Sequence, residues 1–263
     1  ASGLEVSQHF ATSKDGARVP YFQVSPKGMA LDGTRPTLLY GYGGFEVSLT
    51  PSYSGSVGRG WLSQGGVYVV ANIRGGGEYG PRWHQAALKQ HRLRAYEDFA
   101  AVAEHLVARK VTSPRHLGIE GGSNGGLLVG NMLTLYPQLF GAVVCQVPLL
   151  DMQRYSKLLA GASWMAEYGD PDVAEQWEFI RTFSPFHTVQ KDAKYPPVLF
   201  TTSTRDDRVH PGHARRMMAK MAEMGHDVRY YENVEGGHGG SANNQQAAYM
   251  DALAYMFLAK TLK

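Results

Sequence analysis

The sequence contains a single cysteine, Cys145, among its 263 residues. A lone cysteine excludes a disulfide within the chain. The residues around it, 142–147, are mostly apolar and β-branched, which is typical of a buried strand. We therefore expect Cys145 to be an inert thiol in the core rather than a reactive group.

The sequence also lacks a strong excess of charge. It has 26 Lys and Arg against 23 Asp and Glu, a formal net charge of +3, and no run of basic residues. Proteins that bind nucleic acids usually concentrate basic residues in a patch or tail. We therefore expect no nucleic-acid partner.

Long hydrophobic runs are missing as well. No stretch reaches the length of a membrane span without a charge, and the N-terminus has no signal-peptide pattern. We therefore expect no membrane partner and a cytoplasmic location, or a periplasmic or secreted one if a leader has been removed. The length fits one large domain or two small ones, with a substantial core. Because repeats, low-complexity segments and a linker are missing, we expect one domain over residues 1–263.

Glycine, in contrast, is abundant, and it frames one serine in a G-x-S-x-G pattern formed by Gly121, Ser123 and Gly125. Residues 117–119 read as a strand, and residues 127–133 are apolar nearly all round, as in a buried helix. This pattern is typical of a nucleophile elbow, in which a serine in strained backbone connects a strand to a helix.

The rest of the chain alternates apolar runs of strand length with segments of helical period. The expected strands are 37–40, 67–73, 117–119, 141–147, 197–202 and 228–231, and the expected helices include 96–110 and 213–224. This alternation predicts the α/β class, with a mostly parallel sheet covered by helices on both faces.

Three further expectations concern single segments. Residues 19–24 contain a proline near their start and are expected to form an antiparallel strand at the sheet edge. Residues 150–189 are expected to be irregular and rich in aromatic side chains. The closing helix is expected to bury one face, formed by Met250, Leu253, Ala254, Phe257 and Leu258.

Candidate catalytic residues follow the ends of the predicted strands, where function gathers in parallel sheets. Ser123 needs a base to take its proton, and the base needs a third group to orient it. After the elbow, the sequence offers Asp206 or Asp207 at one strand end and His238, flanked by four glycines, at the next. We expect activity to fall at acid pH, where His238 is protonated.

An oxyanion formed at Ser123 needs hydrogen-bond donors. One is the backbone N–H of Asn124, and the second should come from the loop after residues 37–40, either from a backbone amide or from the phenol of Tyr42. We expect no metal site, because His210 and His213 lack a third ligand cluster nearby. We also expect no cofactor, because glycines 75–77 lack dinucleotide-binding spacing.

Three motifs together resemble the peptidase domain of the prolyl oligopeptidase family. They are Tyr40-Gly-Tyr-Gly-Gly-Phe45, Ala71-Asn-Ile-Arg-Gly-Gly-Gly-Glu-Tyr-Gly80 and Gly121-Gly-Ser-Asn-Gly-Gly-Leu-Leu128. The resemblance runs from about Lys14 to the end of the chain. It implies an α/β-hydrolase fold and a serine peptidase that cleaves on the carboxyl side of proline in short peptides.

The resemblance also implies roles for single residues. In the family's Asp-Asp-Arg-Val pattern, the first aspartate completes the triad, which is Asp206 here, and the second oxyanion donor is the hydroxyl of Tyr42. Arg208 would hold a substrate carbonyl, and Trp164 would stack on the substrate proline. The same pocket would be lined by Tyr168, Phe45 and Val209 and bordered by Asn124.

One part of the family pattern is missing from this sequence. The family carries a β-propeller over the active site, and no segment here resembles propeller blades. We therefore expect a separated peptidase domain, with a β-propeller domain or fragment outside this sequence as a potential partner. Two other functions stay open at this point: a peptidase or esterase of broader specificity, and a catalytically weak domain that acts as a structural or binding half.

Overall fold

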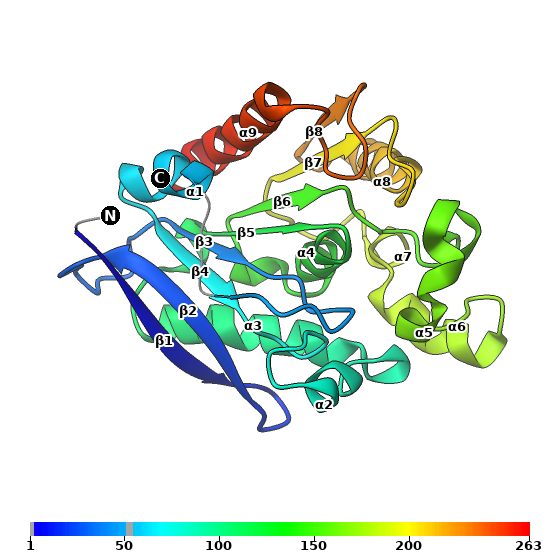
Figure 1. Cartoon of the computed structure of the whole chain (residues 1–263), viewed down its shortest axis with the longest axis horizontal. Coiled ribbons are helices and arrows are strands. Elements are labelled where there is room, and N and C mark those ends of the chain that lie inside the picture. Colours follow the sequence, from blue (N-terminus) through cyan, green and yellow to red (C-terminus); the bar gives the residue numbers. More distant parts are fainter. Residues whose placement is uncertain (1–2, 51–54) are drawn as a thin grey trace.

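The computed structural model describes residues 3–50 and 55–263. Within these residues, eight strands form one sheet in the order β1-β2-β4-β3-β5-β6-β7-β8 (Figure 1). The pairs β1–β2 and β2–β4 are antiparallel. All later pairs in this order, from β4–β3 to β7–β8, are parallel. The strands are β1 Leu4–Thr12, β2 Arg18–Pro26, β3 Thr37–Tyr40, β4 Val67–Ala71, β5 Leu117–Gly122, β6 Ala142–Gln146, β7 Val198–Ser203 and β8 Val228–Asn233.

Helices cover both faces of the sheet, as the alternating pattern predicts (Figure 1). Side chains from α3, α4 and α8 form one apolar cluster with one face of the sheet. Side chains from α1 and α9 form a second cluster on the opposite face. The helices are α1 Gly55–Gly60, α2 Pro81–Gln85, α3 Leu93–Ala108, α4 Asn124–Leu135, α5 Met165–Tyr168, α6 Ala174–Ile180, α7 Pro185–Thr188, α8 Gly212–Glu223 and α9 Asn244–Leu262.

The central elements agree with the expectations from the sequence. The predicted helix 213–224 is α8, which ends before Gly225, and Gly225 has the positive φ of 88° that a helix-terminating glycine adopts. Cys145 is fully buried in β6, and burial raises the pKa of its thiol. The expected burial of Cys145 in a strand is confirmed, and a raised pKa keeps its thiol protonated at neutral pH.

Residues 19–24 form the expected antiparallel strand, but the expectation that this strand lies at the sheet edge is wrong. β2 lies between β1 and β4, and the edge is β1, whose nine residues pair with β2 along their whole length. Pro20 is tolerated because it lies opposite Asn72, just beyond the last ladder pair of Tyr21 with Ala71, and the carbonyl oxygen of Asn72 accepts the Nε1–H of Trp83 instead.

The expectation of irregular structure over residues 150–189 is also wrong. The segment contains α5, α6 and α7 together with short 3-10 turns, and each of these helices has seven residues or fewer. Helices of one or two turns are too short to show a hydrophobic period, and tertiary packing stabilises them instead. Three of the aromatic side chains in this segment are fully or almost fully buried, namely Tyr155, Tyr168 and Phe183.

The buried face of α9 differs in part from the expected one. Met250, Ala254 and Leu258 are buried as expected, but the buried side chains also include Tyr255 and Leu262. Leu253 and Phe257 line an open groove instead. Among the residues that the structure describes, no helix combines the length and the apolar character needed to cross a membrane.

Candidate active site

The elbow at Ser123 has the strained backbone that its sequence predicts. Ser123 has φ 59° and ψ −114°, a backbone conformation that residues other than glycine rarely adopt. Helix α4 begins at the next residue. A Cβ atom on Gly121 would lie 2.2 Å from the carbonyl oxygen of Gly125. Glycine at position 121 therefore lets strand β5 and helix α4 approach closely enough to form the turn.

Asp206 and His238 lie together beyond the ends of β7 and β8. The Nδ1 atom of His238 lies 2.8 Å from Oδ2 of Asp206, whose carboxylate is completely buried. Oδ1 of Asp206 accepts the backbone N–H groups of Arg208 and Val209, each at 2.9 Å. The adjacent Asp207 is exposed. The geometry therefore favours Asp206, of the two aspartates, as the partner of the histidine.

The environment of Asp206 keeps its carboxylate charged. Burial alone would raise the pKa of Asp206, but the hydrogen bond from His238 and those from the two backbone amides outweigh it and lower this pKa. A carboxylate that accepts Nδ1–H of His238 fixes the ring so that Nε2 is free to accept a proton. Within the described part of the chain, no hydrogen bond joins the Ser123 hydroxyl to this ring, so the contact between nucleophile and base remains a prediction.

Tyr42 lies in the loop that follows β3, beside the N-terminus of α4. The Nδ2 atom of Asn124 donates to the carbonyl oxygen of Tyr42 at 2.7 Å, which links this loop to the elbow. Burial raises the pKa of Tyr42, although the positive charges of Arg208 and Arg92 oppose this shift. The phenol therefore keeps its proton at neutral pH and is able to donate a hydrogen bond.

The residues expected in the proline pocket fall into an accessible and a buried group. Trp164 and Phe45 are half-buried, and Arg208 is exposed. Tyr168 has no exposed surface and contacts Phe45 edge to face, with the ring centroids 5.7 Å apart. Val209 is 2% exposed. Tyr168 and Val209 therefore lie behind the surface that a substrate would meet, and their expected contact with substrate remains a prediction.

Two buried charged residues that lie beside this site were not among the residues expected from the sequence. Arg92 is fully buried and its Nη1 lies 3.2 Å from Oε2 of Glu167, which is 4% exposed. One signal was present for Arg92: it precedes Tyr96 and Phe99 at helical spacing, so a basic residue lies in line with an apolar helix face. Glu167 lies within the short helix α5, which has no readable period.

The two histidines considered for a metal site, His210 and His213, each accept hydrogen bonds from backbone N–H groups. The Nδ1 atom of His210 accepts the N–H of Gly212 at 2.8 Å. The Nδ1 atom of His213 accepts the backbone N–H groups of Leu150 and Asp151, each at 3.0 Å. Burial lowers the pKa of His213 to about 4, so this ring is neutral. Over residues 3–50 and 55–263, no three His, Cys, Asp or Glu side chains gather as metal ligands would.

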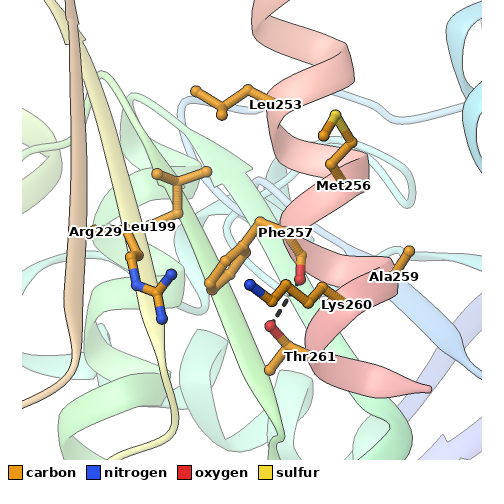
Figure 2. Close-up of a pocket in the computed structure, with 8 residues that line it drawn as sticks. All are labelled: Leu199, Arg229, Leu253, Met256, Phe257, Ala259, Lys260 and Thr261. Carbon is orange, nitrogen blue, oxygen red and sulfur yellow. Dashed lines mark hydrogen bonds between the residues drawn. The ribbon is translucent and has the colours of Figure 1, made fainter.

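An apolar groove of about 550 Å³ lies between α9 and strands β7 and β8 (Figure 2). Its lining includes Leu199 and Arg229, each the second residue of its strand, together with Leu253, Met256 and Phe257 from the helix. The groove therefore lies toward the beginning of these strands. Asp206 and His238 follow the ends of the same strands, so the groove is not part of the candidate active site.

A serine elbow that connects a central parallel strand to a buried helix, with a paired aspartate and histidine after later strands, defines the α/β-hydrolase class. The comparisons with known proteins agree with this class. The model of the prolyl oligopeptidase family matches residues 53–263.

The chain is similar to several peptidases. It is 55% identical over 262 residues to an uncharacterized peptidase, y4nA, of Sinorhizobium fredii, covering 100% of this chain and 36% of the relative. It is 40% identical to a prolyl endopeptidase of Elizabethkingia miricola, covering 93% and 35%. A solved structure of a post-proline cleaving enzyme from Rickettsia typhi superposes with a TM-score of 0.97 at 44% identity, covering 99% of this chain and 38% of that one.

The chain belongs to the prolyl oligopeptidase family. It spans little more than a third of the length of the relatives that it matches.

Proposed function

We propose that this chain carries a serine endopeptidase activity that hydrolyses peptide bonds on the carboxyl side of proline in short peptides. The observation that supports this proposal best is the hydrogen bond of 2.8 Å between His238 and the buried Asp206 in a chain with a serine elbow. The names of the relatives, prolyl endopeptidase and post-proline cleaving enzyme, support the same reaction and specificity.

In the proposed mechanism, Nε2 of His238 takes the proton of the Ser123 hydroxyl as Oγ attacks the scissile carbonyl carbon. Asp206 orients the imidazole and stabilises its protonated form. The tetrahedral intermediate collapses as His238 passes the proton to the leaving amine, which leaves an ester on Ser123. Water, activated by the same histidine, then hydrolyses this acyl-enzyme and regenerates the hydroxyl.

Two donors would stabilise the negative oxygen of the intermediate. One is the hydroxyl of Tyr42, whose raised pKa keeps it protonated, and the other is the backbone N–H of Asn124 at the start of α4. The positive end of the α4 dipole adds to their effect. Loss of one such donor typically costs roughly 10²–10³ in rate.

The preference for proline would come from Trp164 and Phe45. Both rings are half-buried, so each offers an apolar face at the surface. Within a peptide, a proline ring is apolar and has no N–H to satisfy, so a flat aromatic side chain suits it. The exposed guanidinium of Arg208 would bind a backbone carbonyl of the substrate.

The test is hydrolysis of a blocked Gly-Pro chromogenic peptide, with a Gly-Ala peptide as comparator and Ser123→Ala as control. We expect cleavage after proline that is lost in Ser123→Ala and that declines at acid pH as His238 is protonated. Equal cleavage of both peptides would replace the proposal with a broader peptidase. A folded chain that cleaves neither peptide and does not react with a fluorophosphonate would indicate a structural or binding role.

A further inference from the structure

The buried ion pair between Arg92 and Glu167 is costly for a purely structural contact. Moving charged groups out of water carries a large desolvation penalty, and well-packed apolar residues often replace such pairs without loss of stability. The two residues are 75 positions apart in sequence, and both are at least 96% buried. Stability alone therefore does not explain this pair, and the groups that its two side chains hold in place indicate a second role.

On its guanidinium side, the pair holds the loop that carries Tyr42. Nη2 of Arg92 donates to the carbonyl oxygen of Gly43 at 2.6 Å and to Oδ1 of Asn124 at 3.2 Å. The same Asn124 side chain donates from Nδ2 to the carbonyl oxygen of Tyr42. Two successive carbonyl groups, those of Tyr42 and Gly43, are thus held by side chains that are themselves hydrogen-bonded to each other.

On its carboxylate side, the pair holds the segment that carries the expected proline pocket. Oε1 of Glu167 accepts the backbone N–H of Phe45 at 3.2 Å and lies 2.8 Å from Nε2 of His84. Glu167 belongs to α5, which begins directly after Trp164. A single carboxylate therefore connects the backbone at Phe45 to the helix that follows Trp164.

The shape of the guanidinium suits this arrangement. Arg92 donates to Glu167 from one terminal nitrogen and to Gly43 and Asn124 from the other. A lysine ammonium is a point charge and does not offer this fork in fixed geometry. The guanidinium also lies 5.7 Å from the centroid of the Tyr168 ring, so an aromatic neighbour stabilises its charge further.

We propose that Arg92 and Glu167 are positioning residues that fix the Tyr42 oxyanion donor and the Phe45–Trp164 pocket relative to each other. This inference rests on the proposed function of the same site. Its consequence is that the rate of the chemical step and the preference for proline depend on one buried pair. Disrupting the pair displaces both groups, and a misplacement of about 1 Å costs on the order of 10²-fold in rate.

The experiment measures kcat and KM for the Gly-Pro and Gly-Ala peptides in Glu167→Gln, Arg92→Lys and the double variant Arg92→Met/Glu167→Met. The double variant removes both charges together, so it is expected to fold even if a single variant does not. We expect a fall in kcat of about 10–100-fold for the proline peptide in each variant, with a several-fold loss of the proline-to-alanine ratio of kcat/KM. We expect this loss in the double variant even where its Tm equals that of the wild type.

Asp151→Asn is the matched control. Asp151 is a buried carboxylate that pairs with Arg154 and Arg216 at 2.9 and 2.8 Å, outside the proposed site. We expect this variant to lose stability while its proline-to-alanine ratio stays that of the wild type. A double variant that keeps the wild-type kcat and ratio would overturn the positioning role.

A second readout separates the two proposals. The rate of fluorophosphonate labelling of Ser123 depends on the oxyanion donors but not on proline. If the wild type labels but shows no preference for proline, the proposed specificity fails, and slower labelling of the double variant still supports positioning of Tyr42. If the wild type labels and all variants label equally fast, positioning fails. A folded wild type that neither labels nor cleaves would contradict both proposals.

Discussion

The hydroxyl of Tyr42 can be removed without changing the volume of its ring. Because burial keeps the phenol protonated, Tyr42→Phe deletes a donor and no charge. We expect kcat for the Gly-Pro peptide to fall about 10²–10³-fold with little change in Tm. The control is Tyr249→Phe, an exposed tyrosine of α9. Wild-type kcat in Tyr42→Phe would exclude the phenol as an oxyanion donor.

Glu120, on β5, allows a test of stability against pH. Burial, and then the negative charge of Asp251, raise the pKa of Glu120 from 4.5 to about 7. Its other titratable neighbours are three tyrosines, Tyr40, Tyr68 and Tyr255, whose pKa values are also raised. Between about pH 4.5 and 7 the folded state holds a proton that the unfolded state has lost, so stability falls as the pH rises through this range.

Glu120→Gln imitates the protonated carboxyl. We expect the free energy of unfolding to rise by about 1–3 kcal/mol at pH 8, and by clearly less at pH 5, relative to the wild type. Urea denaturation at the two pH values measures this difference. Glu104→Gln, at an exposed position of α3, is the control. An equal change at both pH values would contradict the raised pKa.

At the scale of elements, the close approach of β5 and α4 leaves room for a Cβ atom at Gly122 but not at Gly121. A Cβ atom on Gly121 would clash with the backbone of Gly125 at 2.2 Å, whereas one on Gly122 would meet nothing closer than 3.7 Å. We expect Gly121→Ala to lower the free energy of unfolding by about 1–3 kcal/mol, which is the typical cost of an overpacked core. Gly122→Ala should change it little. Urea denaturation of both variants tests this, and equal stability would argue against a tight elbow.

At the scale of the whole molecule, the described residues form one eight-stranded sheet covered by helices, and no propeller blade is among them. We expect the 263-residue chain by itself to cut long unfolded proteins after proline as well as short peptides, because the described residues include no propeller that would screen substrates by size. Mass spectrometry of a reduced, alkylated protein, with Ser123→Ala as control, measures this. Cleavage confined to short peptides would contradict the expectation.

The candidate site was predictable where one segment carried the signal. Ser123 was identified by its glycines, and the backbone strain that they imply is present. The choice between Asp206 and Asp207 could not be made from spacing, because both residues follow the same strand and spacing does not show which of two adjacent side chains points inward. The family resemblance pointed to Asp206, and in the structure Asp206 is the buried one of the two.

Three features were not predicted from the sequence. β1 was not among the expected strands, because it is an edge strand with mixed burial and its sequence carries only a weak alternating signal. Arg92 and Glu167 meet only because α5 packs beside the residue that precedes α3, and no local pattern encodes that contact. Leu253 and Phe257 have helical spacing, but whether such residues are covered depends on how α9 lies on the sheet.

The sequence alone determined the α/β class, the elbow at Ser123 and the order of the candidate catalytic residues. These features depend on backbone preference, hydrophobic period and chain order, which act over a few neighbouring residues. Only the tertiary structure decided that Asp206 pairs with His238, that β2 is an inner strand, and that one buried ion pair connects the Tyr42 loop to the Trp164 segment. Such contacts join residues far apart in sequence, and the packing of the whole core determines which of them meet.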